Sequence, residues 1–242
     1  YGRATRWRSV IAPPTFLFSC EGIGAPRGLG GVHAMWSGAS FEMEDVLREG
    51  TGIRGTVTPS GLTPKETKFA GSAILQEFTY DFSTLGGEAI AKVRQWSMRT
   101  ERDTAQAHGK YNYLEPASYT PEEIDRIFAD YEKEEIRGAE PRYWEDVEEG
   151  QALPHGVKGP LRVTDNIAWK IGWGFMPFVY AHKIAVDFYK KHPHAFIFNE
   201  SGIPDVPERV HWDTEFARRV GVPEAYDYGP QRVSWLCQGV TN

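Results

Sequence analysis

Residues 203–242 read IPDVPERVHWDTEFARRVGVPEAYDYGPQRVSWLCQGVTN, and the interpretation of the whole chain starts from this stretch. A proline-rich loop carries an acid, Asp205, and a base, His211. Residues 213–220 predict a short helix. The step Gly229-Pro230 then opens a largely apolar helix, because proline in the first helical turn forgoes no hydrogen bond.

A similar pattern occurs near the other end, where residues 10–20 read VIAPPTFLFSC. Pro13 and Pro14 fit the first turn of a helix, and the apolar run 15–20 predicts a helix that is buried on all sides. The glycine-rich run 22–31 lacks the preceding strand and the lysine of a phosphate-binding loop. We interpret it as a helix exit and loop.

From residue 32 to residue 102 the hydrophobic period changes to two, which is typical of strands. Alternation is clearest in 73–80 and 89–96, and 85–87 (LGG) fits a hairpin turn between them. A buried helix followed by antiparallel strands predicts an α+β unit with a sheet wrapped around a helix. The predicted strands are 33–44, 52–58, 68–81 and 88–100.

The middle of the chain predicts connectors and a second unit. Residues 103–118 are a polar linker, and Thr120-Pro121-Glu122-Glu123 is a capping box that starts an amphipathic helix. A second unit begins at residue 143. In it we expect Thr164 to cap one helix, and Met176-Pro177 to start another that ends near residue 191. His192 and His194 flank a proline without a nearby acid, which favours surface histidines over a metal site.

Composition limits the classes of function. The chain has 242 residues and a net charge of −6, so no nucleic-acid surface is suggested. No apolar window is long enough to cross a membrane, and no secretory leader is visible. Two cysteines without metal spacing fit a reducing cytoplasm. We therefore expect a cytoplasmic protein with no membrane contact. The chain starts without Met and stops inside a predicted helix, so we expect a fragment of a longer polypeptide or one chain of a complex.

The motifs resemble those of the MaoC-like acyl dehydratases, also called type-2 enoyl-CoA hydratases, which have the hot-dog fold. The run EFARRVGVP from Glu215 and the Gly229-Pro230 step match the family's pattern, and His211 falls on its loop histidine. IAPPTF from Ile11 resembles the N-terminal, dehydratase-like half, and EDVEEGQALP from Glu145 resembles the start of a second half. The family aspartate, five residues before the histidine, falls on Val206, so this sequence departs from the pattern there.

The resemblance implies an α+β double hot-dog, with an antiparallel sheet around a central helix in each half and the second half incomplete. We expect residues 1–118 to form an N-terminal half that binds the acyl chain without catalysing. Residues 119–142 then form a linker helix, and residues 143–242 a C-terminal half truncated after its central helix. In that case strands from outside these 242 residues cover the second helix, as part of a homo- or hetero-oligomer of hot-dog halves.

The implied activity is reversible hydration of an enoyl thioester, or dehydration of a 3-hydroxyacyl thioester, in fatty-acid metabolism. The reaction needs a base, an acid and a donor for the developing oxyanion, and no metal or other cofactor. The implied catalytic residues are His211, Asp205 and Gly229, with Asp213 and Glu208 as other candidates for the acid. The family's order of a loop histidine followed by Gly-Pro implies that His211 lies near the N-terminus of the Gly229 helix. Substrate-binding residues are expected at Tyr226, Tyr228, Pro230, Pro13 and Pro14.

Two other function classes stay open. Since the acid is displaced from its family position, the chain could be a non-catalytic hot-dog subunit that supports an active dehydratase partner. A thioesterase is the third interpretation, because hot-dog proteins include such enzymes. The expected substrate is an acyl-CoA or another acyl thioester in each case.

Overall fold

The structure of the protein is a computed structural model. It describes residues 2–20, 22–23, 27–29, 32–67, 71–100, 114–138, 140–141, 143–174, 179–220 and 222–241. Most of the predicted linker 103–118, the glycine-rich run 24–26 and 30–31, and the predicted helix start at Met176-Pro177 lie outside the described residues.

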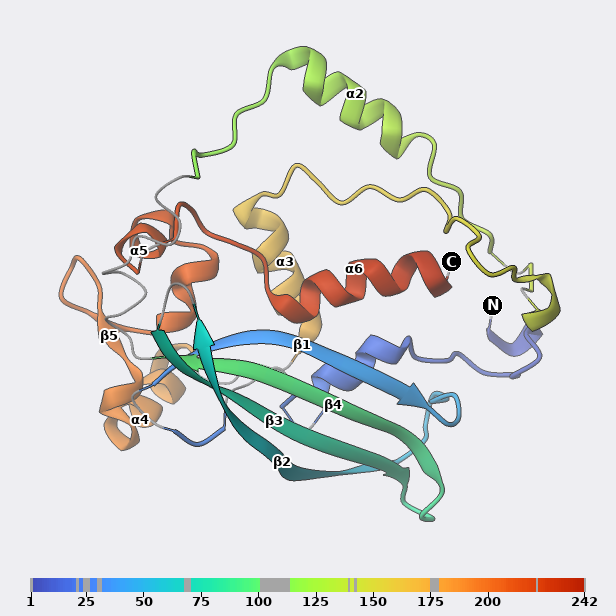
Figure 1. The fold of residues 1–242 in the computed structure, drawn as a ribbon, viewed down its shortest axis with the longest axis horizontal. Coiled ribbons are helices and arrows are strands. Elements are labelled where there is room, and N and C mark those ends of the chain that lie inside the picture. The colour runs from blue at the N-terminus through green and yellow to red at the C-terminus, as the bar shows by residue number, and fades with distance from the viewer. Residues whose placement is uncertain are drawn as a thin grey trace.

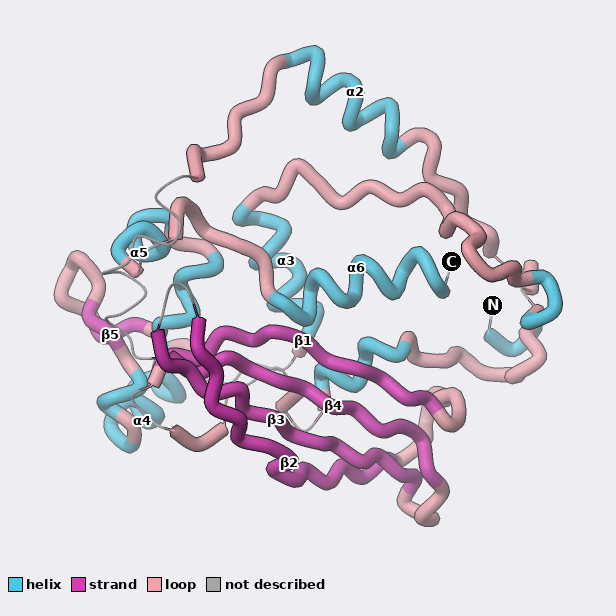
Figure 2. The backbone as a smooth tube through the Cα atoms, viewed as in Figure 1, coloured by secondary structure: helices cyan, strands magenta, loops and turns pink. Residues whose placement is uncertain are grey.

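A four-stranded antiparallel sheet forms the N-terminal half (Figures 1 and 2). Its strands lie in the order β1-β4-β3-β2, so β1 and β2 are the edges. A turn at 85–88 joins β3 to β4, and Gly87 there adopts a φ of 95°, which glycine tolerates. The predicted antiparallel sheet is confirmed. Its strands are β1 (His33–Met43), β2 (Ile53–Thr67), β3 (Gly71–Thr84) and β4 (Ala89–Thr100).

The period of two has the expected physical cause. From residue 91 to residue 99 of β4, buried and more exposed side chains alternate, because successive side chains point to opposite faces of a strand. Tyr80 and Val93 are completely buried on the inner face. β2 runs nine residues beyond its predicted end at residue 58. A register shift between Pro59 and Gly61 interrupts its pattern, and an edge strand tolerates a proline there.

The first predicted helix is shorter and less enclosed than expected. It is η2 (Pro14–Ser19), a six-residue 3-10 helix preceded by another short one, η1 (Gly2–Ala4). Leu17 and Phe18 are buried against the sheet, whereas Phe16 is 44% exposed. The prediction of a helix buried on all sides was therefore wrong, because the sheet packs against only one side of η2.

The C-terminal half is mostly helical. Its elements are α2 (Pro121–Tyr131), η3 (Trp144–Asp146), α3 (Val163–Trp173), α4 (His182–Lys191), η4 (Pro193–Ala195), η5 (Pro207–His211), α5 (Thr214–Arg219) and α6 (Gly229–Thr241), with β5 (Ile197–Phe198) and β6 (Pro204–Asp205) as an antiparallel pair. Helix α6 lies over β1 and η2 (Figure 1). Within the described ranges, no strand longer than two residues follows β4.

Local signals gave mixed results in this half. The capping box at Thr120 is confirmed, since its side chain accepts from Glu123 N–H while Glu123 accepts from Thr120 N–H. Thr164 is not a cap, because Asp165 binds the N–H of Arg162 and α3 starts at Val163. Helix α4 ends at Lys191, as predicted, but the described helix starts at His182 rather than at Met176-Pro177, and residues 179–181 are not helical.

Helix α6 is also less buried than predicted. Only Pro230 and Gln231 are buried, and Leu236 is 69% exposed. Of the later residues, Val233 is partly buried against the core. That strands from outside these 242 residues cover α6 stays a prediction.

Candidate active site

Helix η5 carries His211 and begins with Pro207, which fits the first helical position. Helix η5 ends at His211. Asp213 then caps α5, because its side chain accepts a hydrogen bond from Phe216 N–H at 2.9 Å. Asp213 also lies 3.2 Å from Arg209. Asp213 therefore already serves as a helix cap and a salt-bridge partner.

The imidazole of His211 is fixed by the segment just before α6. Its Nδ1 lies 2.8 Å from the carbonyl oxygen of Tyr226, and its ring stacks on that of Tyr228 with centroids 3.8 Å apart. A carbonyl oxygen can only accept, so Nδ1 carries the proton and Nε2 keeps its lone pair. These contacts put the imidazole beside the residues that precede Gly229, as the sequence predicted.

Burial keeps this imidazole neutral. Burial removes water from around the ring, which disfavours its charged form and lowers the pKa of His211 from 6.5 to about 4. The Tyr226 carbonyl opposes the shift, whereas the charge of Lys170 adds to it. At neutral pH, Nε2 is therefore available as a base.

A buried ion pair lies next to this histidine. Lys170 of α3 is 3% exposed, and its Nζ contacts Oε1 of Glu208. Burial raises the pKa of Glu208 and lowers that of Lys170, while each partner opposes the shift of the other. Lys170 also lies 5.2 Å from the ring centroid of Tyr228. Tyr228 is thus packed between the imidazole and this pair.

Among the described residues, three buried polar atoms around the histidine have no partner of hydrogen-bond geometry: Glu208 Oε2, Tyr228 Oη and Asn166 Oδ1. The Tyr228 hydroxyl adjoins Glu208, and burial together with the Glu208 charge raises the pKa of that hydroxyl. Asn166 uses its amide nitrogen to donate to the carbonyl oxygens of His211 and Tyr226. Buried polar atoms are usually paired, so such a cluster indicates a place for a polar ligand.

Asp205 lies elsewhere. Its carboxylate accepts from Val206 N–H at 2.7 Å and lies 4.0 Å from Arg209 Nη1. In the described part of the chain, no hydrogen bond or ion pair joins Asp205 to His211. The structure therefore does not bring this predicted acid together with the predicted base.

Gly229 and Pro230 form the first turn of α6. A Cβ on Gly229 would lie 2.1 Å from Cε3 of Trp36, so glycine lets the helix approach β1 closely. The N–H of Gly229 makes no hydrogen bond within the described ranges, as expected at a helix N-terminus. Gln231, which is buried, accepts from the N–H of Tyr228 at 3.2 Å. The free N–H is thus held in a rigid turn.

The other predicted substrate-binding residues are Tyr226, which contacts His211, and Pro13 and Pro14, which lie in another element. Tyr226 is half-exposed and touches His211 through its ring as well as its carbonyl. Pro13 and Pro14 lie at the start of η2, which packs beneath α6. In the described part of the chain, no hydrogen bond or ring contact joins either proline to His211. They belong to the support of the site.

Sequence reasoning missed Asn166 and Lys170. Both lie on one face of α3 with Trp169 and Trp173, at spacings of three and four residues. Trp173 donates from its indole N–H to Phe18 O at 2.8 Å, which fixes α3 to η2. An asparagine and a lysine four residues apart on a Trp-rich helical face were the signal available in the sequence.

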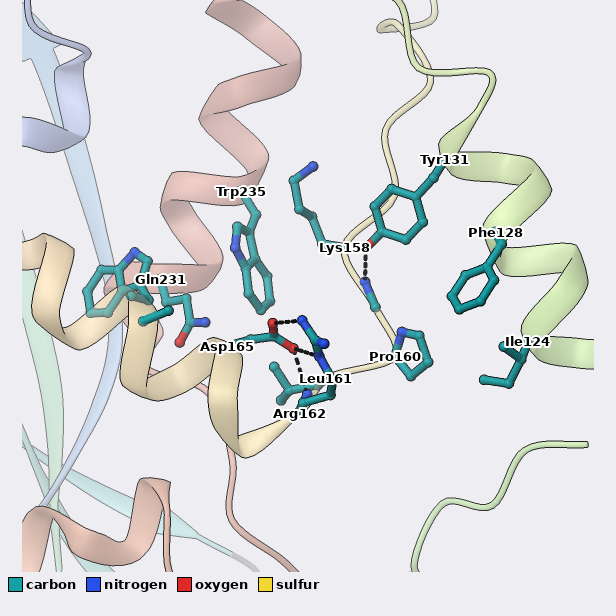
Figure 3. A pocket seen from close by; sticks show the side chains of 13 residues that line it. Ile124, Phe128, Tyr131, Lys158, Pro160, Leu161, Arg162, Asp165, Gln231 and Trp235 are labelled. Carbon is teal, nitrogen blue, oxygen red and sulfur yellow. Dashed lines mark hydrogen bonds and ion pairs between the residues drawn. The ribbon is translucent and has the colours of Figure 1, made fainter. Parts of the chain in front are cut away.

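A cavity of about 750 Å³ lies between α2, α3 and α6 (Figure 3). Trp169 and Gln231 form part of its wall and also contact Tyr228, so it borders the histidine site. On the α2 side, the Tyr131 hydroxyl accepts from Gly159 N–H at 3.0 Å. Its lining is mainly apolar, with Lys158, Arg162 and Asp165 at the edge.

Among the described residues, no group of three or more histidine, cysteine or acidic side chains could hold a metal ion. No described helix is long and apolar enough to span a membrane.

Three comparisons relate this geometry to known proteins. Residues 1–93 match the family model described as "FAS1-like, dehydratase domain region". No curated protein matches the chain. The solved structure of a "MaoC-like dehydratase" is similar with a TM-score of 0.53 and 15% identity, over 94% of this chain and 62% of that one. The present chain thus spans less than two thirds of that protein.

Two further solved structures share a smaller part. The ChsH1-ChsH2 complex from Mycobacterium tuberculosis matches 38% of the chain and 63% of its own, at 14% identity and a TM-score of 0.32. A MaoC-like dehydratase from Rhodospirillum rubrum matches 42% and 69%, at 14% identity and a TM-score of 0.30. The predicted resemblance to the MaoC-like dehydratases is confirmed by the dehydratase-region match over residues 1–93 and by the hot-dog fold that most of the chain shares with a MaoC-like dehydratase.

Proposed function

We propose that this chain catalyses the reversible hydration of an enoyl thioester, with His211 as the base. The observation that carries the proposal is the state of this imidazole. Its Nδ1 proton is held by Tyr226 O, and burial keeps the ring neutral. A neutral imidazole with a free Nε2 can deprotonate a water molecule.

The N-terminus of α6 supplies the second part of the proposed mechanism. During hydration, negative charge develops on the thioester carbonyl oxygen as water adds to the β carbon. The unpaired N–H of Gly229, at the positive end of a 13-residue helix, is suited to stabilise that charge. Tyr226, Tyr228 and Pro230 surround this turn, and we propose that they contact the substrate.

The division of labour follows from the position of these groups. The proposed chemistry belongs to the C-terminal half, residues 143–242. Residues 1–118 supply the sheet and η2 against which α6 packs, and residues 119–142 connect the halves. The acyl group would be carried by CoA or by another thiol carrier, in the cytoplasm, and the active unit would be an oligomer of hot-dog halves.

A non-catalytic role is the second candidate, because Asp205 lies away from His211 and the neighbouring Glu208 is held by Lys170. In that case the chain supports an active partner. Hydration of crotonyl-CoA and of a longer enoyl-CoA, followed by loss of the enoyl absorbance, distinguishes the two. We expect turnover by the wild-type chain, alone or with any co-purifying chain. Turnover that persists in full in His211→Ala would leave only the supporting role.

A further inference from the structure

We propose that Glu208 is the proton donor of this site and delivers a proton to the α carbon of the thioester through its Oε2. The inference rests on the proposed hydratase function and names the acid that the sequence pattern left displaced. It assigns the role to Glu208 in place of the predicted Asp205.

The position of Glu208 on η5 carries the first step. Glu208 and His211 are three residues apart in a 3-10 helix, where side chains at this spacing lie above one another. Both also meet the same neighbour, since the imidazole stacks on the Tyr228 ring and the carboxyl adjoins the Tyr228 hydroxyl. An acid and a base therefore lie on one face of one short helix.

The two oxygens of Glu208 have different environments. Oε1 is held by Lys170 Nζ, whereas the buried Oε2 has no partner of hydrogen-bond geometry among the described residues and lies beside the Tyr228 hydroxyl. The Lys170 amine also fixes the orientation of the carboxyl. One oxygen thus holds the group in place, and the other is free to meet a substrate atom.

The pair carries one transferable proton. Burial disfavours the charged forms of both groups, so the ion pair exchanges with a form in which Glu208 carries the proton on Oε2 and Lys170, as the neutral amine, still donates to Oε1. In hydration, His211 Nε2 takes a proton from water while the water oxygen bonds to the β carbon. The electron pair of the double bond moves to the α carbon, which takes the Oε2 proton. His211 ends as a cation and the pair ends one proton short, so proton transfer through solvent restores both.

The other acids are occupied differently. Asp205 binds the Val206 N–H and faces Arg209, and Asp213 caps α5. Asp227 forms a two-point contact with Arg232, with distances of 2.8 and 2.6 Å. Of these carboxyls, Glu208 is the one with a buried, unpartnered oxygen.

The test compares Glu208→Gln, Asp205→Asn and wild type in the enoyl-CoA hydration assay. Glu215→Gln is the matched control, because Glu215 is an exposed glutamate of α5 paired only with Arg218. We expect Glu208→Gln to lower kcat on the order of a hundredfold or more with little change in KM. The factor by which Asp205→Asn lowers kcat should be less than a tenth of the factor for Glu208→Gln. Glu208→Asp should have a higher kcat than Glu208→Gln.

Glu208→Gln alone could unfold the chain, because it leaves the buried Lys170 amine without its acidic partner. In that case the double variant Lys170→Met/Glu208→Gln, which removes both charges, is used instead. A low kcat in either variant, with a thermal transition like that of wild type, supports the inference. A kcat within about threefold of wild type in a folded Glu208 variant would overturn it. So would a larger loss in Asp205→Asn than in Glu208→Gln. A wild-type chain that is inactive on every enoyl-CoA would instead reject the proposed function.

Discussion

At the scale of single residues, the properties of His211 come from two neighbours rather than from the histidine itself. The Tyr226 carbonyl decides which nitrogen carries the proton, and burial against Tyr228 keeps the ring uncharged. Neither contact corresponds to a sequence motif, because each joins η5 to residues that lie fifteen or more positions further along the chain. The sequence predicted the base correctly in position, but its role stays a prediction.

The first prediction concerns the rate. His211→Gln should lower kcat/KM by on the order of a hundredfold or more, because glutamine cannot take a proton from water. The chain offers His194, an exposed histidine of η4, as a control. His194→Gln should leave the rate unchanged, and equal rates for both variants would contradict the assignment of the base.

The second prediction concerns pH. The pKa of His211 is about 4 in the folded chain and 6.5 when unfolded. As pH falls below 6.5, the unfolded chain takes up the proton first, so His211 lowers stability progressively between pH 6.5 and 4. Urea unfolding at pH 7, 5.5 and 4 should show a smaller loss in His211→Gln than in wild type. The acid limb of kcat/KM should lie near pH 4, and a limb at 6.5 would contradict this.

The third prediction concerns Lys170. Lys170→Met should destabilise the fold by about 3–5 kcal/mol, because it leaves the buried Glu208 carboxyl without its partner. The double variant Lys170→Met/Glu208→Gln should regain most of that loss. Chemical denaturation of the three chains measures this, and equal stability of the single and double variants would show that the two groups are not coupled.

At the scale of elements, what could be predicted depended on how local the signal was. Strands β3 and β4 could be predicted because alternation follows directly from strand geometry. The cap of α2 could be predicted because the capping box uses residues within one turn, although the same kind of signal failed at Thr164 in α3. The Lys170–Glu208 pair could not be predicted, because it joins α3 to η5 across thirty-eight residues. The partial burial of η2 could not be predicted either, because it depends on how far the sheet extends over that helix.

The fourth prediction belongs to α6 and its approach to β1. Gly229→Ala should destabilise by about 1–3 kcal/mol, because the new methyl group would overlap the Trp36 ring. Gly239→Ala on the same helix meets only Leu153 at 3.8 Å and should be neutral or stabilising by up to about 1 kcal/mol. Thermal unfolding compares the two, and equal melting temperatures would show that Trp36 moves aside without cost.

At the scale of the whole molecule, the two halves are unequal. The N-terminal half has a sheet that buries Leu17 and Phe18, whereas in α6 only Pro230 and Gln231 are buried. Leu236 and Val240 are 69% and 61% exposed and lie four residues apart, so they share one face. Burial of each such side chain is worth about 1.5–3 kcal/mol, which favours covering this face.

The last prediction follows from that face. In solution we expect the 27.3 kDa chain to associate through α6, so that its mass by sedimentation exceeds that of one chain. Leu236→Lys combined with Val240→Lys should return it to the monomer mass, because the paired charges cannot be buried together. Gln238→Lys, on the same helix, adds charge without removing apolar surface and should leave the association intact. A wild-type chain that sediments as a monomer at every concentration tested would show that this face needs no cover.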